Sequence, residues 1–139
     1  MPIAAHAQKA APWTAAEVTQ PSDLAAALSR HTTPIMLQVG FQVLYKSKHI
    51  PGSIYAGPGS TPQGLEALKR AVRNLPKDAD IYFYCGCCPV IRCPNIRPAY
   101  STLKSMGFTH VHVVMLETSF GQDWVARGYP AIGDAAPGH

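Results

Sequence analysis

The chain has 139 residues, of which 47% are hydrophobic and 14% charged, with 13 Pro and 11 Gly. A chain of this length buries roughly two-thirds of its unfolded surface as one domain, so it needs no disulfides for stability. The net charge of +4 comes without runs of like charge, and no window approaches the roughly 20 apolar residues of a transmembrane helix. These features argue against a nucleic-acid partner and against a membrane span.

Both ends of the chain are expected to be flexible. Residues 1–13 are Ala-rich and aperiodic, and Ala5-His6-Ala7 has the small-x-small form that precedes cleavage of a secretory signal. The basic region and the apolar core of a signal are missing, so 1–13 is either the remnant of a signal peptide, which we favour, or an Ala-rich leader that is simply disordered. This suggests a periplasmic or secreted protein, with a cytoplasmic one as the alternative. Residues 133–139 form the expected tail, which leaves 14–132 as the domain.

Helices and strands alternate between these ends. Ser22 is expected to cap a short helix over 23–28, and the apolar run 35–39 suits a buried strand. Thr61, with a proline directly after it, predicts the cap of a second helix that ends near Asn74.

A second strand and a third helix can be placed from turn residues and prolines. Turn chemistry at 76–79 leads into 81–84, a run of β-formers that predicts a central strand. Proline is tolerated only in the first turn of a helix. With Asn95 as the N-cap, Pro98 takes the third position, and Gly107 ends the helix.

A strand over 110–116 and a short helix around 123–126 follow. Elements that alternate in this way favour right-handed crossovers between parallel strands. We therefore predict an α/β fold with a mostly parallel sheet that helices cover on both faces.

The four cysteines of the chain are clustered within nine residues, at Cys85, Cys87, Cys88 and Cys93. Their segment runs from the end of one predicted strand to the start of the helix capped by Asn95, which is where parallel sheets bind ligands. A helix N-terminus carries about half a unit of positive charge, and Arg92 and Arg97 add full charges. A thiol held there is expected to ionise readily, and the thiolate is the nucleophile.

Cys85 follows the strand directly and is the expected catalytic nucleophile. It would lie on the floor of a cradle of backbone amides that binds an oxyanion such as a sulfonate or phosphate. The substrate-binding residues expected around it are Gly86, Cys87, Cys88, Arg92 and Arg97. Arg97, in the first helical turn, is the arginine we favour for binding the anion, and Arg92 is the alternative.

Several blocks of the chain resemble those of one family, in the same order. His49–Ile54 is similar to the family's His-Ile-Pro-Gly-Ala-Ile block, and Ile81–Cys85 to the strand that ends in its catalytic cysteine. Ala99–Phe108 resembles the helix after the active loop, and Asp123-Trp124 with Gly128–Pro130 resembles the C-terminal Trp and Gly-x-Pro. Over most of its length the chain resembles a single-domain rhodanese, which is a sulfurtransferase.

The resemblance implies a rhodanese-like sheet of about five strands and a persulfide mechanism. Cys85 would take a sulfane sulfur from thiosulfate or a related small anionic donor, hold it as a persulfide, and pass it to cyanide or a thiol. Loop amides and an arginine would stabilise the leaving sulfite. The resemblance implies no cofactor and no metal, and it leaves the oligomeric state open.

The chain departs from the family pattern in two places. Gln38-Val39-Gly40 stands where the family usually has Asp-Val-Arg, and the cysteine segment is longer than the usual active loop and lacks its Arg-Ser ending. The longer loop contains three further thiols. Our hypothesis is that Cys87, Cys88 or Cys93 resolves the persulfide to a disulfide or relays its sulfur.

Two other chemistries fit clustered thiols. Structural zinc sites usually join ligands from separate segments, so a single loop suits zinc poorly, and a soft ion such as Cu(I) is the other candidate. Cys85–Cys88 is also formally a C-x-x-C dithiol, although residues 89–91 separate it from the helix. A structural disulfide from Cys93 to Cys85 or to Cys88 would give a redox gate. A thiol-disulfide redox protein, or a non-catalytic module that binds a metal or sulfur species, is therefore the alternative function.

The histidines and C-terminal aromatic residues suggest less. His49 is expected to be a structural hydrogen-bonding residue at a turn. His110 and His112 alternate along a strand, where a solvated or partly buried strand face explains them better than a metal pair. Trp124 and Tyr129 are expected to pack, with Trp124 reaching the rim of the pocket.

Tyr45, Lys46 and Lys48 are expected on an exposed loop face that helps to attract anionic donors.

Overall fold

The computed structural model of the protein describes residues 11–30, 34–86 and 89–133. Within them, five strands form one sheet in the order β1-β5-β4-β2-β3, and all four strand pairings are parallel. The strands are β1 (Val18–Thr19), β2 (Ile35–Gln38), β3 (Ile54–Tyr55), β4 (Asp80–Tyr84) and β5 (His110–Val114). The predicted α/β class with a parallel sheet of about five strands is confirmed.

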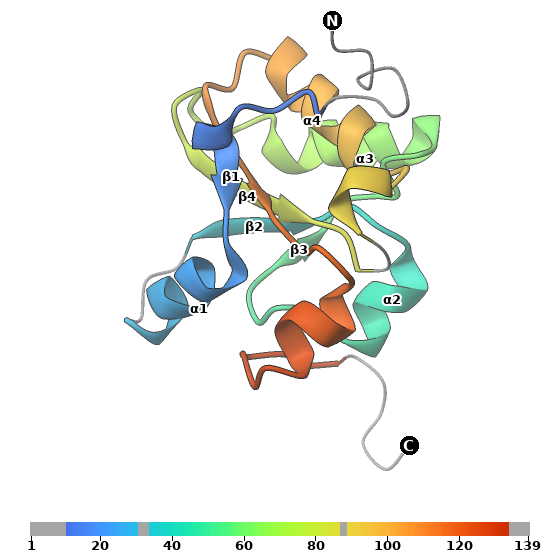
Figure 1. Ribbon diagram of the computed structural model, residues 1–139. Coiled ribbons are helices and arrows are strands. Elements are labelled where there is room, and N and C mark those ends of the chain that lie inside the picture. Colours follow the sequence, from blue (N-terminus) through green and yellow to red (C-terminus); the bar gives the residue numbers. More distant parts are fainter. Residues whose placement is uncertain (1–10, 31–33, 87–88, 134–139) are drawn as a thin grey trace, which may run out of the picture.

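Helices cover both faces of this sheet. They are α1 (Pro21–Ser29), α2 (Gln42–Ser47), α3 (Pro62–Val72) and α4 (Ile96–Ser105), with the single turns η2 (Ala15–Glu17), η3 (Val90–Arg92) and η4 (Gly121–Val125). Figure 1 shows α3 and α4 on one side of the sheet, and α1, α2 and the C-terminal turn on the other. No helix among the described residues is long and apolar enough to cross a membrane.

The core lies on both faces of the central strands. Leu37 of β2, Phe83 of β4 and Val113 of β5 have no exposed surface. Burial on both faces is the reason that residues 35–37 of β2 and 81–84 of β4 are continuous apolar runs rather than alternating ones. Trp13, the last residue of the expected leader, is also buried, and its ring meets Tyr100 edge-on at 6.0 Å. The remainder of the expected leader and tail lies mostly outside the described residues.

Two helix starts differ in how far the sequence predicts them. At α3 the prediction is confirmed, because the Thr61 side chain accepts a hydrogen bond from the Gly64 N–H at 3.0 Å. At α1 the prediction is wrong. The helix begins at Pro21 with Gln20 as the N-cap, and Ser22 lies inside its first turn. Proline fits the first helical position because its missing N–H has no intrahelical partner there.

The elements that sequence patterns miss are the short ones. β1 and β3 have two residues each, too few for a periodic pattern, and they form the two edges of the sheet. The expectation of a loop at Tyr45 and Lys46 is wrong, because both lie on α2. That helix has six residues and no side-chain cap, so it carries no start signal.

The buried glycine of α3 gives a test of the fold. Alanine normally stabilises a helix by about 1 kcal/mol relative to glycine. Here an added Cβ on Gly64 would overlap the carbonyl oxygen of Pro58. We expect Gly64→Ala to lower the free energy of unfolding by about 2 kcal/mol, as overpacking does, in urea denaturation. The exposed neighbour Gln63 is the control, since Gln63→Ala should leave stability nearly unchanged; a Gly64→Ala protein as stable as wild type would contradict the packing.

Candidate functional site

Cys85 lies at the carboxyl edge of the sheet, directly after β4, and has no exposed surface. The extension of β2 runs beside it, because the Val39 N–H donates to the Tyr84 carbonyl at 2.8 Å. A Cβ on Gly40 would lie 3.0 Å from the Cys85 Sγ and 3.1 Å from the Gly86 nitrogen. A glycine at position 40 therefore leaves the space that the sulfur occupies. The structure places the predicted nucleophile where parallel sheets carry their ligand sites.

Asn95 contacts Cys85 from the other side of the loop. Its Nδ2 lies 3.7 Å from the Cys85 Sγ and 3.8 Å from the Cys93 Sγ, and all three residues are buried. Its Oδ1 accepts a hydrogen bond from the Ser60 N–H at 3.0 Å. Since a backbone N–H can only donate, this bond fixes the amide with its NH₂ group toward the two sulfurs.

This role of Asn95 differs from the predicted one. The residue does occupy the N-cap position of α4, but its side chain makes no capping hydrogen bond. The amide serves the sulfurs and the Ser60 turn instead. The sequence identifies the N-cap residue but not the contacts of its side chain, because these depend on Ser60 and Cys85, which lie 35 and 10 positions away in the chain.

The cysteine loop is hydrogen-bonded at its centre, through Val90, to the segment that follows β5. Val90 of η3 is buried, and its N–H donates to the Leu116 carbonyl just after β5 at 3.0 Å. Ile91 and Arg92 of the same turn are exposed. Cys87 and Cys88, which are predicted to bind substrate, lie outside the described residues.

The two predicted anion-binding arginines have different surroundings. Arg97 donates from Nη2 to the Ile91 carbonyl at 3.2 Å, and its guanidinium lies 5.7 Å from the centre of the Trp13 ring. These contacts tie Arg97 to η3 and to the N-terminal segment. Arg92 projects from the exposed side of the turn. A role for either one in binding an anion stays a prediction.

A cavity of about 200 Å³ opens beside the loop, between α2 and η4. Its lining residues are Leu44, Ser47, Lys48, Gly86, Phe120, Gly121 and Val125. Lys48 is the cation among these lining residues, and its part in attracting anionic donors stays a prediction. The expectation that Trp124 reaches the rim is wrong. Its ring has no exposed surface, and its Nε1 donates to the Pro130 carbonyl at 2.6 Å.

The sequence model described as "Rhodanese-like domain" matches residues 20–122, which is most of the chain. The chain belongs to the rhodanese-like domain family. A search of the curated proteins found no match.

Solved structures share the rhodanese-like fold. The rhodanese-like domain of an Anabaena sp. protein is 24% identical, with a TM-score of 0.62 over 88% of this chain and 86% of that one. A single-domain sulfurtransferase of Saccharomyces cerevisiae is 15% identical, with a TM-score of 0.60 over 83% of this chain and 93% of that one. A thiosulfate sulfurtransferase of Pseudomonas aeruginosa is 18% identical, with a TM-score of 0.62 over 86% of this chain and 20% of that one.

Gln38 occupies the position at which the family usually has an aspartate. Its side-chain amide lies beside the cysteine loop at Gly86. It is fully buried, and its Oε1 accepts a hydrogen bond from the Gly40 N–H at 2.9 Å. Its Nε2 has no hydrogen-bond partner, the one such buried side-chain atom in the described part of the chain. A Cβ on Gly86 would lie 2.8 Å from this nitrogen. A buried donor without an acceptor costs about 1–3 kcal/mol, so Nε2 is placed to gain from an acceptor brought to the loop.

A tyrosine hydroxyl of the edge strand β3 contacts Gly40, the glycine that packs against the Cys85 sulfur. Tyr55 of β3 donates from its hydroxyl to the Gly40 carbonyl at 2.9 Å. Burial, and then the negative charge of Cys85, raise the pKa of Tyr55 above its usual value. The raised pKa keeps the hydroxyl protonated, so that it continues to donate to the Gly40 carbonyl.

The His49–Ile54 block fixes the end of β4 through hydrogen bonds to Tyr84. The Tyr84 hydroxyl accepts a hydrogen bond from the Ile50 N–H at 3.0 Å and lies 3.0 Å from the Ser53 Oγ. Burial raises the pKa of Tyr84, so this hydroxyl stays neutral. His49 is buried, bonds through Nδ1 to the Tyr45 carbonyl at 2.7 Å, and stacks on the Tyr45 ring. These contacts give His49 the structural role that the sequence predicts.

The metal alternative stays untested at the cysteine loop, because Cys87 and Cys88 lie outside the described residues. Among the residues that the structure describes, no three His, Cys, Asp or Glu side chains are grouped to hold an ion. His110 is exposed, and His112 pairs with Asp80 at 2.9 Å and stacks on Tyr82. The two histidines therefore belong to a partly solvated strand face.

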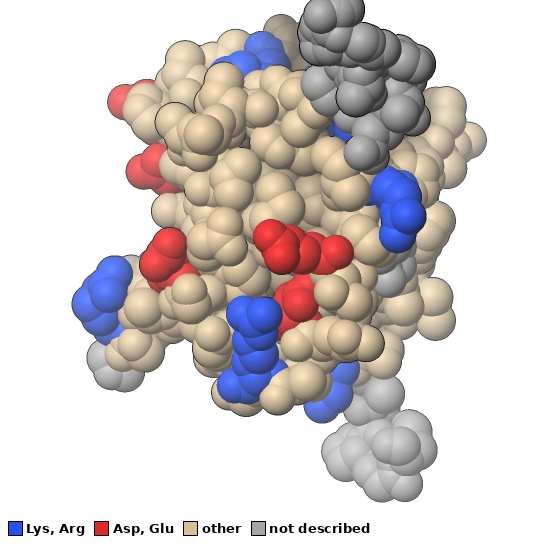
Figure 2. All heavy atoms as spheres, viewed as in Figure 1, with Lys and Arg blue, Asp and Glu red and all other residues tan. Residues whose placement is uncertain are grey.

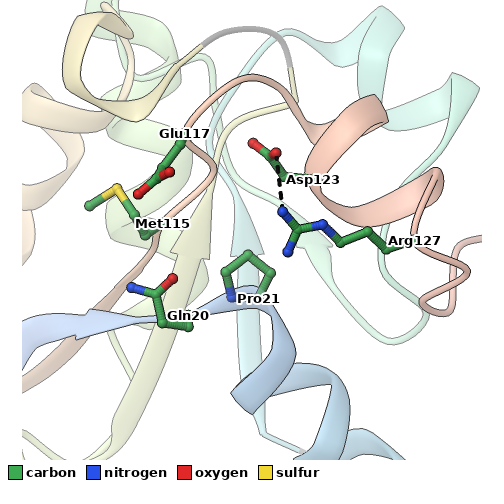
Figure 3. A pocket seen from close by; sticks show the side chains of 6 residues that line it. All are labelled: Gln20, Pro21, Met115, Glu117, Asp123 and Arg127. Carbon is green, nitrogen blue, oxygen red and sulfur yellow. Dashed lines mark ion pairs between the residues drawn. The ribbon is translucent and has the colours of Figure 1, made fainter.

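A second cavity lies at the end of β5, away from the cysteine loop. Figure 2 shows acidic and basic side chains mixed on one face of the molecule. Figure 3 shows Glu117, Asp123 and Arg127 around a cavity of about 30 Å³, with the Asp123–Arg127 pair 3.8 Å apart. Asp123 accepts hydrogen bonds from the Thr118 and Ser119 N–H groups and so fixes the start of η4. Such a volume holds only a water or two, so the carboxylate is structural.

The hydroxyl of Tyr84 can be tested as the anchor of the strand before Cys85. Tyr84→Phe leaves the buried Ile50 N–H without its acceptor. We expect the free energy of unfolding to fall by about 1–3 kcal/mol in urea denaturation. Tyr82→Phe is the matched control on the same strand, because the Tyr82 hydroxyl has no hydrogen-bond partner among the described residues. Equal stability of the two variants would contradict the anchoring role.

Proposed function

We propose that the protein is a sulfurtransferase that moves a sulfane sulfur from an anionic donor such as thiosulfate to a thiol or cyanide, through a persulfide on Cys85. The observation that carries the proposal is the Cys85 sulfur, held at the carboxyl edge of the sheet with the Asn95 NH₂ donor 3.7 Å away. Membership of the rhodanese-like family supports it. The named sulfurtransferases among the solved structures of the same fold support it as well.

The first half-reaction breaks the sulfur–sulfur bond of the donor. The Cys85 thiolate attacks the sulfane sulfur, and sulfite leaves with the electron pair of the broken bond. The new bond joins the sulfane sulfur to Sγ, which leaves a perthiolate on Cys85. A charged sulfur accepts hydrogen bonds more strongly than a thiol, so the Asn95 amide favours both the thiolate and the perthiolate. The second half-reaction returns Cys85 to the thiolate as the acceptor takes the outer sulfur.

The cavity beside Gly86 suits entry of the two substrates. Leu44, Phe120 and Val125 supply apolar walls beside Gly86, the residue that follows Cys85. Lys48 places a positive charge among the lining residues, where it raises the local concentration of an anionic donor. The uncapped N-terminus of α4 adds its partial positive charge at the loop.

The decisive experiment measures sulfur transfer by the reduced protein. Incubation with thiosulfate and cyanide should give thiocyanate, and mass spectrometry of samples quenched early in the reaction without cyanide should show one added sulfur on Cys85. Cys85→Ser should abolish both signals, because an alcohol does not form a persulfide. Thermal unfolding of the variant checks that it is folded. Absence of thiocyanate and of the added sulfur in the reduced wild-type protein would refute the proposal.

The part played by Lys48 has its own test. Lys48→Ala should raise the KM for thiosulfate by about two- to fivefold, as the loss of one exposed charge does, and should change kcat little. Lys69→Ala is the matched control, since this exposed lysine lies on α3 on the opposite side of the sheet. High salt should weaken the difference between wild type and Lys48→Ala. A KM for Lys48→Ala equal to that of the control would exclude Lys48 from donor binding.

A further inference from the structure

One amide nitrogen holds two thiols in this site. The Asn95 Nδ2 lies within 3.8 Å of both the Cys85 Sγ and the Cys93 Sγ. The proposed sulfur transfer uses only Cys85. Cys93 is as buried as Cys85, at 1% exposure, in a loop whose neighbouring residues Arg92 and Pro94 are exposed. A second thiol is therefore kept inside, next to the nucleophile.

The side-chain amide of Asn95 is held in one orientation, and for this reason it does not cap α4. A capping side chain at the start of α4 would contribute about 1 kcal/mol, and Asn95 does not make that bond. Its Oδ1 is fixed by the Ser60 N–H instead. A Cβ on Gly59 would overlap the Asn95 carbonyl, so the Gly59-Ser60 turn packs directly on this residue. These contacts aim the NH₂ group at the two sulfurs.

We propose that Cys93 resolves the persulfide on Cys85, so that the protein also reduces the sulfane sulfur to hydrosulfide. The inference rests on the proposed function, which supplies the persulfide. The Cys93 thiolate attacks the Cys85 Sγ, the inner sulfur of the persulfide. The Cys85–Cys93 disulfide forms, the persulfide bond breaks, and the outer sulfur leaves with the electron pair as hydrosulfide.

The electrons of this step balance without an outside oxidant. Two thiols and one thiosulfate give one disulfide, one sulfite, one hydrosulfide and one proton. The two thiols are oxidised, and the sulfane sulfur is reduced. A low-molecular-weight thiol or dithiol then returns the disulfide to two thiols by exchange, which makes the cycle thiol-dependent.

The attack that we propose is on the inner sulfur. The Cys85 Sγ and the Cys93 Sγ both lie within 3.8 Å of the Asn95 Nδ2, so Cys93 is placed to reach the Cys85 Sγ, and the outer sulfur is then the leaving group. Closing the disulfide brings the sulfurs to about 2.05 Å. The chain between them must adjust, and η3 offers two exposed residues, Ile91 and Arg92, on its outer side. Asn95 acts as a positioning residue for both thiols.

A single-turnover experiment tests the inference on the full chain. Reduced protein receives an equimolar amount of thiosulfate, without cyanide or added thiol, and released hydrosulfide is measured. Trypsin cleaves after Lys77, Arg92 and Lys104 but not between Arg97 and Pro98, so Cys93 is alone on peptide 93–104. We expect hydrosulfide close to one equivalent and a disulfide that links peptides 78–92 and 93–104.

Cys93→Ser separates resolution from transfer. This variant should release no hydrosulfide and should accumulate the added sulfur on peptide 78–92, while it still forms thiocyanate when cyanide is present. The double variant Cys87→Ser/Cys88→Ser leaves Cys85 as the one thiol on that peptide. The link to 93–104 should persist in it. Loss of the link in a double variant that still forms thiocyanate with cyanide, or hydrosulfide release from Cys93→Ser at the wild-type level, would overturn the inference.

Asn95→Asp tests the positioning role. The carboxylate still accepts from the Ser60 N–H, but it removes the donor and places a negative charge beside the thiolates. In competition with cyanide, the share of sulfur released as hydrosulfide should fall at least fivefold, whereas a merely structural defect would lower both products together. An unchanged share would remove Asn95 from the inference.

The outcomes distinguish the two proposals. If no added sulfur forms on wild type or on Cys93→Ser, the proposed function and the inference both fail. If both proteins hold a stable persulfide and release no hydrosulfide, sulfur transfer stands and the resolving role of Cys93 is overturned.

Discussion

The register of β2 against β4 is the constraint on which the site depends. Gln38 pairs with Tyr84, and the Val39 N–H continues the pairing to the Tyr84 carbonyl. Parallel strands end at the same edge, so this register places Gly40 against the Cys85 sulfur and Gln38 against Gly86. A slip of one residue would turn every side chain of β2 to the opposite face and remove the space for the thiol. The nucleophile is thus positioned by backbone pairing before any side chain of the loop contributes.

Buried polar side chains then complete the site, each through partners remote in sequence. Tyr84 joins the end of β4 to the Ile50–Ser53 turn, and Asn95 joins the cysteine loop to the turn at Ser60. Polar groups inside a protein are nearly always hydrogen-bonded, and a neutral thiol is a weak acceptor. A thiolate or perthiolate is a stronger one, so the Asn95 amide is better satisfied when a sulfur beside it is charged. The Asn95 amide therefore favours the charged form of the sulfurs and also fixes the position of the loop.

The regular elements and the motif order of this chain were open to sequence analysis because they depend on local chemistry. Neighbouring residues alone determine the apolar run at β2, the Thr61 cap of α3 and the start of α4, which follows from the position of Pro98. β1 and β3 were missed because two-residue strands carry no period, and they exist only where β5 and β2 supply hydrogen bonds. The Gln38 amide was noted only as a departure from a family pattern, and its orphaned nitrogen became visible with the packing of Gly86.

The sequence by itself determined the α/β class, the strand that leads into Cys85, and the clustering of four thiols before a helix. Those features follow from periodicity, turn chemistry and spacing, which are local. Only the tertiary structure decided that Asn95 faces two sulfurs rather than its own helix, that Lys48 lines the cavity at Gly86, and that Trp124 is sealed in the core. Each of these depends on chain segments that pack together from distant positions, and a hydrogen-bonding side chain takes the partner that folding brings within reach.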